Sequence, residues 1–299
     1  MKMLGMILIL IAFCLVISIS GCTQQGGYAV AKGTVSYYNR PAPEYAQARF
    51  NETPYAAVYK ISYRSRDAAI YGLLAVPKSC SESSKCGAFV LLPAATVSKE
   101  SEQKWLANKL NSLGFATLAI DQRGIGETGG YVPDLKEDFQ TWASGGETAQ
   151  SKMVYDCLAA FDILASRPEV DGDRIFAAGS SMGGRFAILA AYIEPKIKAL
   201  LLVSTSGYGL PQTPYQNMTE FLAYIDPDSY IGKLAGRKIL MIHAAQDQVI
   251  SLSSGQRTFG FAQEPKKFVA VDATFHGYYH LDGTPVPGIV DENIGWLTS

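Results

Sequence analysis

One serine stands out because a glycine lies two residues before it and another two residues after it, in Gly179-Ser180-Ser181-Met182-Gly183. The spacing selects Ser181 over Ser180, because the frame of Ser180 would put Ala178 where the first glycine belongs. A serine hydroxyl becomes a nucleophile when a base removes its proton, and that base needs a third group to hold its tautomer. The chemistry that this pattern indicates is nucleophilic attack by Ser181.

The base has few candidates, because the chain has three histidines. His243 falls inside or at the end of a predicted strand, and we interpret it as structural. His276 follows the last predicted strand by a few residues, and Gly277 next to it permits a close approach. His280 is the rival and lies further from the strand. We therefore predict His276 as the base.

The carboxylate that orients the base is expected in a loop after another strand. Asp247 directly follows the predicted strand 239–243, although an aspartate in such a loop is more often a cap or a turn residue. Chain order favours the catalytic interpretation, because Ser181, Asp247 and His276 follow one another as serine, aspartate and histidine.

The elements that must position these residues alternate along the chain. A buried strand precedes Ser181 and a helix follows it, which predicts a sharp, strained turn that presents the serine; the alternative is an ordinary glycine-rich turn. An antiparallel pair of strands opens the fold, and the remaining apolar strands alternate with helices, which predicts a mainly parallel sheet covered on both faces. The eight predicted strands are 56–65, 68–77, 88–92, 115–120, 174–178, 197–203, 239–243 and 268–271, and the helices are 100–113, 147–166, 184–191 and 254–262, with residues 290–297 closing the chain.

Two stretches, 129–146 and 206–228, fit no element. Both follow strands, so both are expected over the carboxyl edge of the sheet, where such folds bind ligands. The second stretch is too short for a full cap domain. The sequence therefore predicts a minimal lid over an open site.

The chain resembles the α/β-hydrolase superfamily over essentially its whole mature length, and within it the dienelactone-hydrolase-like and prolyl-oligopeptidase-like branch. Residues 170–175, leading into Gly-Ser-Ser-Met-Gly-Gly, resemble the entry to the nucleophile in that branch, and residues 121–126 resemble its D-x-R-G-x-G turn. The resemblance implies an α/β-hydrolase fold with Ser181 as nucleophile, His276 as base and Asp247 as the residue that orients it.

The resemblance also implies an oxyanion hole made of two backbone N–H groups. One belongs to Met182, the residue after the nucleophile. The other comes from the loop after strand 88–92, where relatives carry His-Gly followed by the donor. That loop is Pro-Ala-Ala-Thr here, so His and Gly are both absent and Ala95 aligns with the donor.

These residues predict a serine hydrolase that cleaves a carboxylic ester through an acyl-enzyme, acting on a small-molecule ester or a short peptide. No metal and no organic cofactor is implied. A serine peptidase or amidase, or an acyltransferase, would use the same triad, and a non-catalytic surface binding protein is an alternative of another class. The formal net charge is −1 and no long run of Lys or Arg occurs, so the sequence shows no basic patch of the kind that binds nucleic acid.

The first residues differ in composition from the rest, because no charge occurs between Lys2 and Lys32 and residues 3–19 are almost entirely apolar. Ile-Ser-Gly-Cys at 19–22 resembles the lipobox of prokaryotic lipoprotein signal peptides, in which the cysteine is lipidated. The resemblance implies lipidation of Cys22 and an extracytoplasmic protein anchored to the membrane of a prokaryotic cell envelope. An uncleaved anchor helix is the alternative.

The domain organisation follows from this resemblance. Residues 1–21 would be the lipoprotein signal peptide, 22–34 a small, polar tether and 35–299 the catalytic domain. Cys80 and Cys86 bracket a polar loop in that domain, and in an oxidising compartment the pair predicts a disulfide. A Cys pair with this spacing could instead bind metal, but no further Cys or nearby His completes a site.

Overall fold

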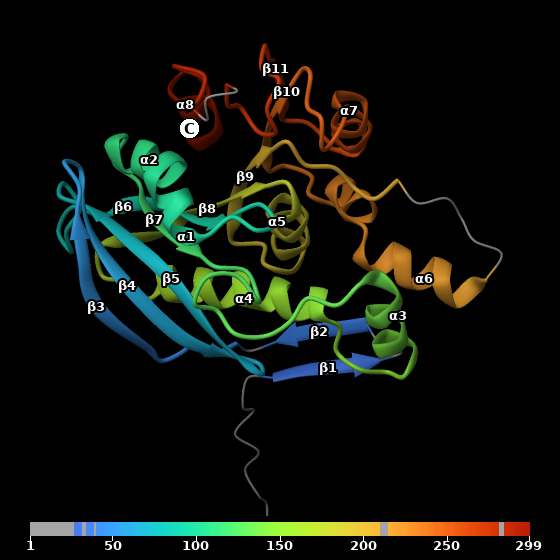
Figure 1. Cartoon of the computed structure of the whole chain (residues 1–299). Coiled ribbons are helices and arrows are strands. Elements are labelled where there is room, and N and C mark those ends of the chain that lie inside the picture. Colours follow the sequence, from blue (N-terminus) through green and yellow to red (C-terminus); the bar gives the residue numbers. More distant parts are fainter. Residues whose placement is uncertain (1–26, 32–33, 39, 210–214, 281–283) are drawn as a thin grey trace, which may run out of the picture.

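The computed structural model describes residues 27–31, 34–38, 40–209, 215–280 and 284–299 (Figure 1). The predicted signal peptide and the lipidation of Cys22 lie outside the described residues. Among the helices that are described, none combines the length and the apolar composition needed to span a membrane.

A sheet of nine strands forms the centre of the described part of the chain, in the order β11-β10-β9-β8-β6-β7-β5-β4-β3. The six strands from β6 to β11 are parallel, and β5, β4 and β3 continue the sheet as antiparallel neighbours. The predicted α/β architecture is therefore confirmed, with one strand more than expected. The strands are β3 (Tyr45–Glu52), β4 (Ala56–Ser65), β5 (Ala68–Pro77), β6 (Cys86–Leu92), β7 (Ala116–Ile120), β8 (Val170–Ser180), β9 (Ile197–Val203), β10 (Lys238–Ala244) and β11 (Lys266–Val271).

Helices cover both faces of this sheet, and the alternation along β6 shows how (Figure 1). Ala88, Val90 and Leu92 point into the core under α4 (Ala149–Ala165) and α5 (Met182–Ile193). Phe89 and Leu91 point into the opposite core, under the helical segment 99–112 and α8 (Asp291–Thr298). The continuous apolar run of β6 is thus explained by burial on both faces.

The helical segment 99–112 consists of three consecutive parts. Its parts are α1 (Lys99–Glu102), a π-helical turn (Gln103–Ala107) and α2 (Asn108–Ser112), which together match the helix predicted over 100–113. The other helices are α3 (Leu135–Ala143), α6 (Gln216–Ile225), α7 (Leu252–Phe261) and two short 3₁₀ turns (Pro227–Ser229 and Ile231–Lys233).

A buried carboxyl group in α1 gives the fold a pH-dependent stability. Glu102 is 7% exposed, and burial raises its pKa from 4.5 to about 7. A carboxyl group whose pKa is raised on folding binds its proton more tightly in the folded state, so stability falls as pH rises from 4.5 through 7. We expect Glu102→Gln to raise the free energy of unfolding by about 3 kcal/mol at pH 8 and to change it little at pH 4, as measured by urea denaturation. An equal change at both pH values would contradict this account.

The two stretches without assignment each contain a helix, and the two helices pack together. Trp142 and Phe139 of α3 contact Phe221 of α6, with ring centroids 5.9 Å and 5.5 Å apart. Asp134 begins α3 by accepting a hydrogen bond from the backbone N–H of Glu137 at 2.8 Å. This pair, with nine residues in α3 and ten in α6, agrees with the expectation of a small accessory segment and not a cap domain.

Part of the segment predicted to be a tether forms strands, beginning at Gly27. β1 (Gly27–Ala31) and β2 (Thr34–Tyr38) form a separate antiparallel pair of strands. The Tyr37 hydroxyl joins this pair to the catalytic domain, because it lies 2.8 Å from Ser151 O and 2.9 Å from Glu147 Oε1. β1 and the first residue of β2 therefore lie inside the segment predicted to be a tether, while the boundary predicted at residue 35 stays a prediction.

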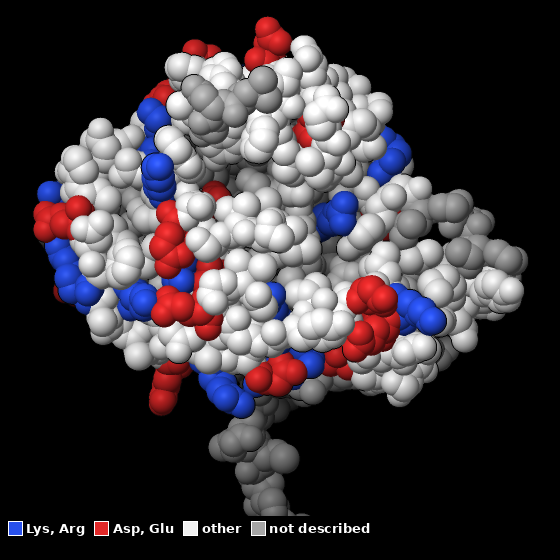
Figure 2. All heavy atoms as spheres, in the orientation of Figure 1, with Lys and Arg blue, Asp and Glu red and all other residues white. Residues whose placement is uncertain are grey.

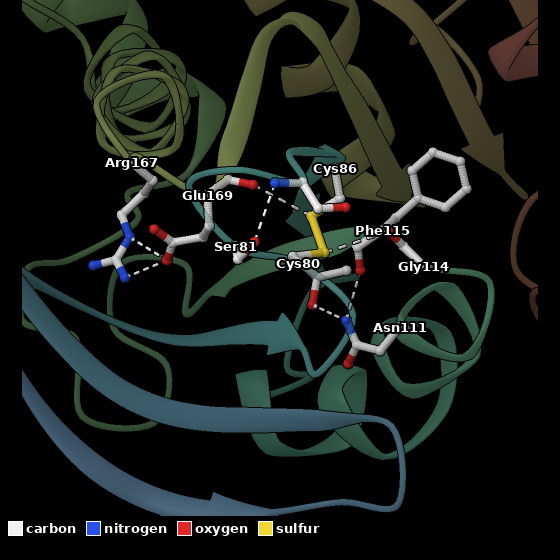
Figure 3. The surroundings of a disulfide bond; sticks show 10 residues. Cys80, Ser81, Cys86, Asn111, Gly114, Phe115, Arg167 and Glu169 are labelled. Atoms are coloured by element: carbon white, nitrogen blue, oxygen red, sulfur yellow. Dashed lines mark hydrogen bonds and ion pairs between the residues drawn. A yellow bond between two sulfur atoms is a disulfide. The ribbon is translucent and has the colours of Figure 1, made fainter.

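The predicted disulfide is present between Cys80 and Cys86 (Figure 3). It closes the polar loop that joins β5 to β6. The backbone N–H of Cys86 donates to Glu169 O at 3.1 Å, just before β8 begins, so the loop is also held against the segment that enters that strand.

Candidate active site

Ser181 lies between the last residue of β8 and the first residue of α5, as predicted. Its φ of 52° falls in the region that favours glycine, so the backbone is strained there. The neighbouring strand holds this conformation, because the N–H of Ser181 donates to Val203 O at 2.8 Å and the hydroxyl of Thr205 donates to Ser181 O at 2.6 Å. The side chain of Ser181 is buried at the end of the sheet.

The two glycines of the motif are needed for close backbone approach. A Cβ atom at Gly179 would lie 2.4 Å from Gly183 O, and a Cβ atom at Gly183 would lie 2.0 Å from Leu92 O. These distances are too short for any side chain. The elbow and the end of β6 are therefore packed backbone against backbone.

Gly183→Ala is expected to lower the free energy of unfolding by roughly 3 kcal/mol or more, because the new methyl group must displace the backbone at the end of β6. Thermal denaturation measures the effect. Gly260→Ala in α7 is the matched control, since the position has open space and alanine is favoured in a helix by about 0.5–1 kcal/mol. A Gly183→Ala protein as stable as the control would disprove the packing argument.

His276 and Asp247 are brought together by loops that follow β11 and β10. The Nδ1 atom of His276 lies 2.8 Å from Oδ2 and 3.0 Å from Oδ1 of Asp247. A carboxylate only accepts, so Nδ1 carries the proton and Nε2 of the neutral ring is unprotonated, which is the tautomer of a general base. The Nε2 atom is buried and makes no hydrogen bond to any described residue.

The Asp247 carboxylate is held ionised by several donors. Its Oδ1 atom accepts hydrogen bonds from the backbone N–H groups of Val249 at 2.8 Å and Ile250 at 2.9 Å. Burial would raise the pKa of Asp247, but the hydrogen bonds from His276, Ile250 and Val249 outweigh it and hold that pKa well below its usual range. Asp247 is therefore a fixed negative charge beside the imidazole.

Ser204, which the sequence did not single out, joins the serine and histidine segments. It directly follows Val203, the residue that holds Ser181, and has a φ of 40°. Its hydroxyl donates to Gly277 O at 3.1 Å and accepts from Gly277 N–H at 3.0 Å, next to His276. The structure thus places Ser181 and His276 on adjoining segments at one edge of the sheet. Ser204 acts here as a positioning residue.

The two other histidines have different environments. His243 is fully buried in β10 with Nε2 2.9 Å from Ile250 O, and burial lowers its pKa. Since a carbonyl only accepts, Nε2 of His243 donates, as expected for a structural residue. His280 is exposed, and its backbone N–H donates to Thr284 O at 2.8 Å.

The two residues expected at the oxyanion hole lie in the predicted segments. Met182 is the first residue of α5, where backbone N–H groups have no partner within the helix. Ala95 is exposed in a turn after β6, next to Thr96, which has a φ of 65°. The beginning of that loop contacts Gly183, because Pro93 O would lie 2.6 Å from a Cβ atom there. The donor role of Ala95 stays a prediction.

Together, the doubly covered parallel sheet and the serine elbow at the end of β8 define an α/β-hydrolase. The chain belongs to the acetyl xylan esterase (AXE1) family, whose model matches residues 31–230. The family supports the prediction of a hydrolase that acts on carboxylic esters. The more specific resemblance to the dienelactone-hydrolase-like and prolyl-oligopeptidase-like branch stays a prediction.

Individual relatives agree with this class. The chain is 38% identical over 92 residues to the putative hydrolase YtaP of Bacillus subtilis (strain 168), a match that covers 31% of this chain and 30% of that protein. The chain spans less than two thirds of the length of the first curated relatives that it matches.

Two solved structures share the fold. An acetyl xylan esterase from Paenibacillus sp. R4 has a TM-score of 0.68 and 20% identity, covering 86% of this chain and 89% of that one. Acetyl xylan esterase 1 from Thermoanaerobacterium sp. JW/SL YS485 has a TM-score of 0.65 and 17% identity, covering 86% and 87%. At these identities the likeness concerns the fold alone.

Proposed function

We propose that the chain is a serine esterase in which Ser181 is the nucleophile, His276 the base and Asp247 the carboxylate that orients His276. The observation that carries the proposal is the hydrogen bond of 2.8 Å between His276 Nδ1 and Asp247 Oδ2, at the edge where the elbow presents Ser181. It leaves Nε2 of His276 as the only ring nitrogen able to accept a proton.

The reaction follows from these positions. Ser181 Oγ attacks the ester carbonyl carbon while its proton moves to Nε2 of His276, and the negative charge develops on the former carbonyl oxygen. The backbone N–H groups of Met182 and Ala95 would donate to that oxygen, and losing one such donor costs about 10²–10³ in rate. The C–O bond to the alcohol then breaks as His276 returns the proton to the leaving oxygen. Water, deprotonated by the same nitrogen, hydrolyses the acyl-serine.

The substrate class that we propose is an ester with a short acyl group, including acetyl esters of carbohydrates. The family description and the two esterase structures support this choice. The experiment measures kcat/KM for p-nitrophenyl esters from acetate to octanoate, for acetylated xylan and for matched p-nitroanilides. We expect turnover of the short esters and little cleavage of the amides.

Other results would reject this function in a defined way. Faster cleavage of anilides than of esters would indicate a peptidase or amidase. Transfer of the acyl group to an added alcohol in preference to water would indicate an acyltransferase. Folded protein that cleaves no ester and does not react with a fluorophosphonate probe would indicate a non-catalytic binding protein.

We also propose that the protein is lipid-anchored at Cys22 outside the cytoplasm of a prokaryotic cell. The apolar segment 3–19 and the lipobox-like residues 19–22 support this. Expression with labelled palmitate in a bacterial host tests it, with Cys22→Ser as the control variant. Label should enter the wild type alone and partition with the membrane; equal partition of both proteins would reject lipidation.

A further inference from the structure

A cleft of about 460 Å³ lies beside Asp247, between the segments that follow β9 and β10. Its lining includes Arg185, Ser206, Tyr208, Asp247, Gln248 and Arg257. Figure 2 shows a blue group of basic side chains near the middle of this face, to the right of the place that α5 has in Figure 1. The cleft thus adjoins the candidate triad and contains two guanidinium groups.

Arg185 carries a charge that no carboxylate of the described residues neutralises. Its Nε–H donates to Ser206 O at 2.9 Å, and its guanidinium carbon lies 4.2 Å from the ring centroid of Tyr208. A guanidinium has five N–H donors; one of those of Arg185 binds Ser206 O, and the side chain also interacts with Tyr208. Four other half-buried or buried arginines, Arg40, Arg66, Arg123 and Arg167, form ion pairs, whereas the half-buried Arg237 resembles Arg185 in donating to a backbone carbonyl, that of Ala191.

The other charges of the cleft are already engaged. Arg257 lies 3.2 Å from Asp228 Oδ2 and donates to Gly207 O at 3.0 Å. The side chain of Asp247 is fully buried and is bound to His276. Arg185 is therefore the charged group of this cleft that is fixed by Ser206 and Tyr208 and has no carboxylate partner among the described residues.

The position of Arg185 relates it directly to the nucleophile. It lies in the first turn of α5, and its partner Ser206 directly follows Thr205, whose hydroxyl donates to Ser181 O at 2.6 Å. Its anchor, Ser206, lies two residues after Ser204, which holds the loop of His276. Asp247 lines the cleft, whereas Ser181 and His276 do not, so the proposal requires that an ester attacked at Ser181 extends past the triad to Arg185.

We propose that this cleft binds a carboxylate carried by the ester substrate, and that Arg185 recognises it. The inference rests on the proposed function and deepens it by assigning a substrate class, carboxylate-bearing esters. The Nε–H of Arg185 is engaged by Ser206 and its side chain also interacts with Tyr208, and the proposal is that its terminal nitrogens donate to the substrate carboxylate. The stacking on Tyr208 and the bond to Ser206 fix the plane of the guanidinium before the substrate arrives.

The test uses two pairs of esters that differ only in charge. Mono-(4-nitrophenyl) glutarate and its monoamide place the carboxylate or the neutral amide in the acyl half. 4-Acetoxybenzoate and 4-acetoxybenzamide place it in the alcohol half. The readout is the ratio of kcat/KM for the anionic ester to that for the neutral ester, so a general loss of activity cancels within each variant.

We expect the wild type to favour the anionic ester in at least one pair, and Arg185→Gln to lower that ratio about tenfold. Arg185→Lys should keep part of the preference, because it retains the charge but loses the planar fork. Arg257→Gln is the matched control and should change the ratio by less than about twofold, because the charge of Arg257 is already paired with Asp228.

The outcomes separate this inference from the proposed function. If no ester is cleaved, the proposed function fails. If the esters are cleaved but the wild type shows no anionic preference that salt weakens, the inference is overturned without any variant. It is also overturned if Arg185→Gln keeps the ratio, or if Arg257→Gln lowers it equally, while the esterase activity stands in both cases.

Discussion

Ser181→Ala is expected to lower kcat/KM for p-nitrophenyl acetate by about 10⁴–10⁶-fold. The change removes the attacking oxygen, and the remaining groups can only assist direct attack by water. Alanine retains the Cβ atom and the positive φ of 52°, so the elbow between β8 and α5 keeps its backbone strain and its contacts with Val203 and Thr205. The loss should therefore be chemical and not structural.

Ser180→Ala provides the matched control, because Ser180 is the adjacent serine and ends β8. We expect this variant to remain within about tenfold of the wild type, since its hydroxyl has no role in the proposed mechanism. Labelling by a fluorophosphonate should disappear in Ser181→Ala and persist in Ser180→Ala. The reverse pattern would assign the nucleophile to Ser180.

Buried elements were the part of the fold that the sequence predicted well. The bounds of β4, β5 and β9 agree with the predicted ranges because each has an apolar pattern bounded by turn residues or charges. The elbow was predictable for a different reason, since backbone contact at Gly179 and Gly183 permits no side chain there. Such close approach requires glycine at fixed positions, and the glycines can be recognised in the sequence.

Exposed elements were harder to predict, because their sequences lack a clear apolar pattern. β3 has one intermediate residue and otherwise exposed ones, so its pattern shows no apolar face, and pairing with β4 is what makes it a strand. β1 and β2 begin in the small, polar segment that was predicted to be a tether. The helices α3 and α6 are stabilised by the aromatic contacts between them, which a local pattern cannot reveal.

The candidate site divides in the same way. Ser181, Asp247 and His276 could be predicted because the motif and chain order restrict their types and places. Ser204 and Arg185 could not, because their roles depend on how the end of β9 meets the loop of Gly277 and the first turns of α5. No spacing along the chain encodes those tertiary contacts.

Asp247→Asn is expected to lower kcat by about 10⁴-fold while leaving the fold intact. The backbone N–H groups of Val249 and Ile250 both donate to Oδ1, so an amide at this position must keep its oxygen there. Its NH₂ group then takes the place of Oδ2, 2.8 Å from Nδ1 of His276. The NH₂ group cannot accept from Nδ1–H, and Oδ1, which lies 3.0 Å from Nδ1, is already shared with two backbone N–H groups, so the tautomer with the proton on Nε2 is favoured.

That shift removes the base, because a protonated Nε2 cannot accept the proton of Ser181. Asp247→Ala is the contrasting variant, since it also leaves the N–H groups of Val249 and Ile250 without their acceptor and should lower the thermal stability, as Asp247→Asn should not. His280→Ala, on the same loop as His276, should retain activity. If Asp247→Asn kept its activity within tenfold of the wild type while His280→Ala lost it, the base would be His280, and the tautomer held by Asp247 would have no part in the reaction.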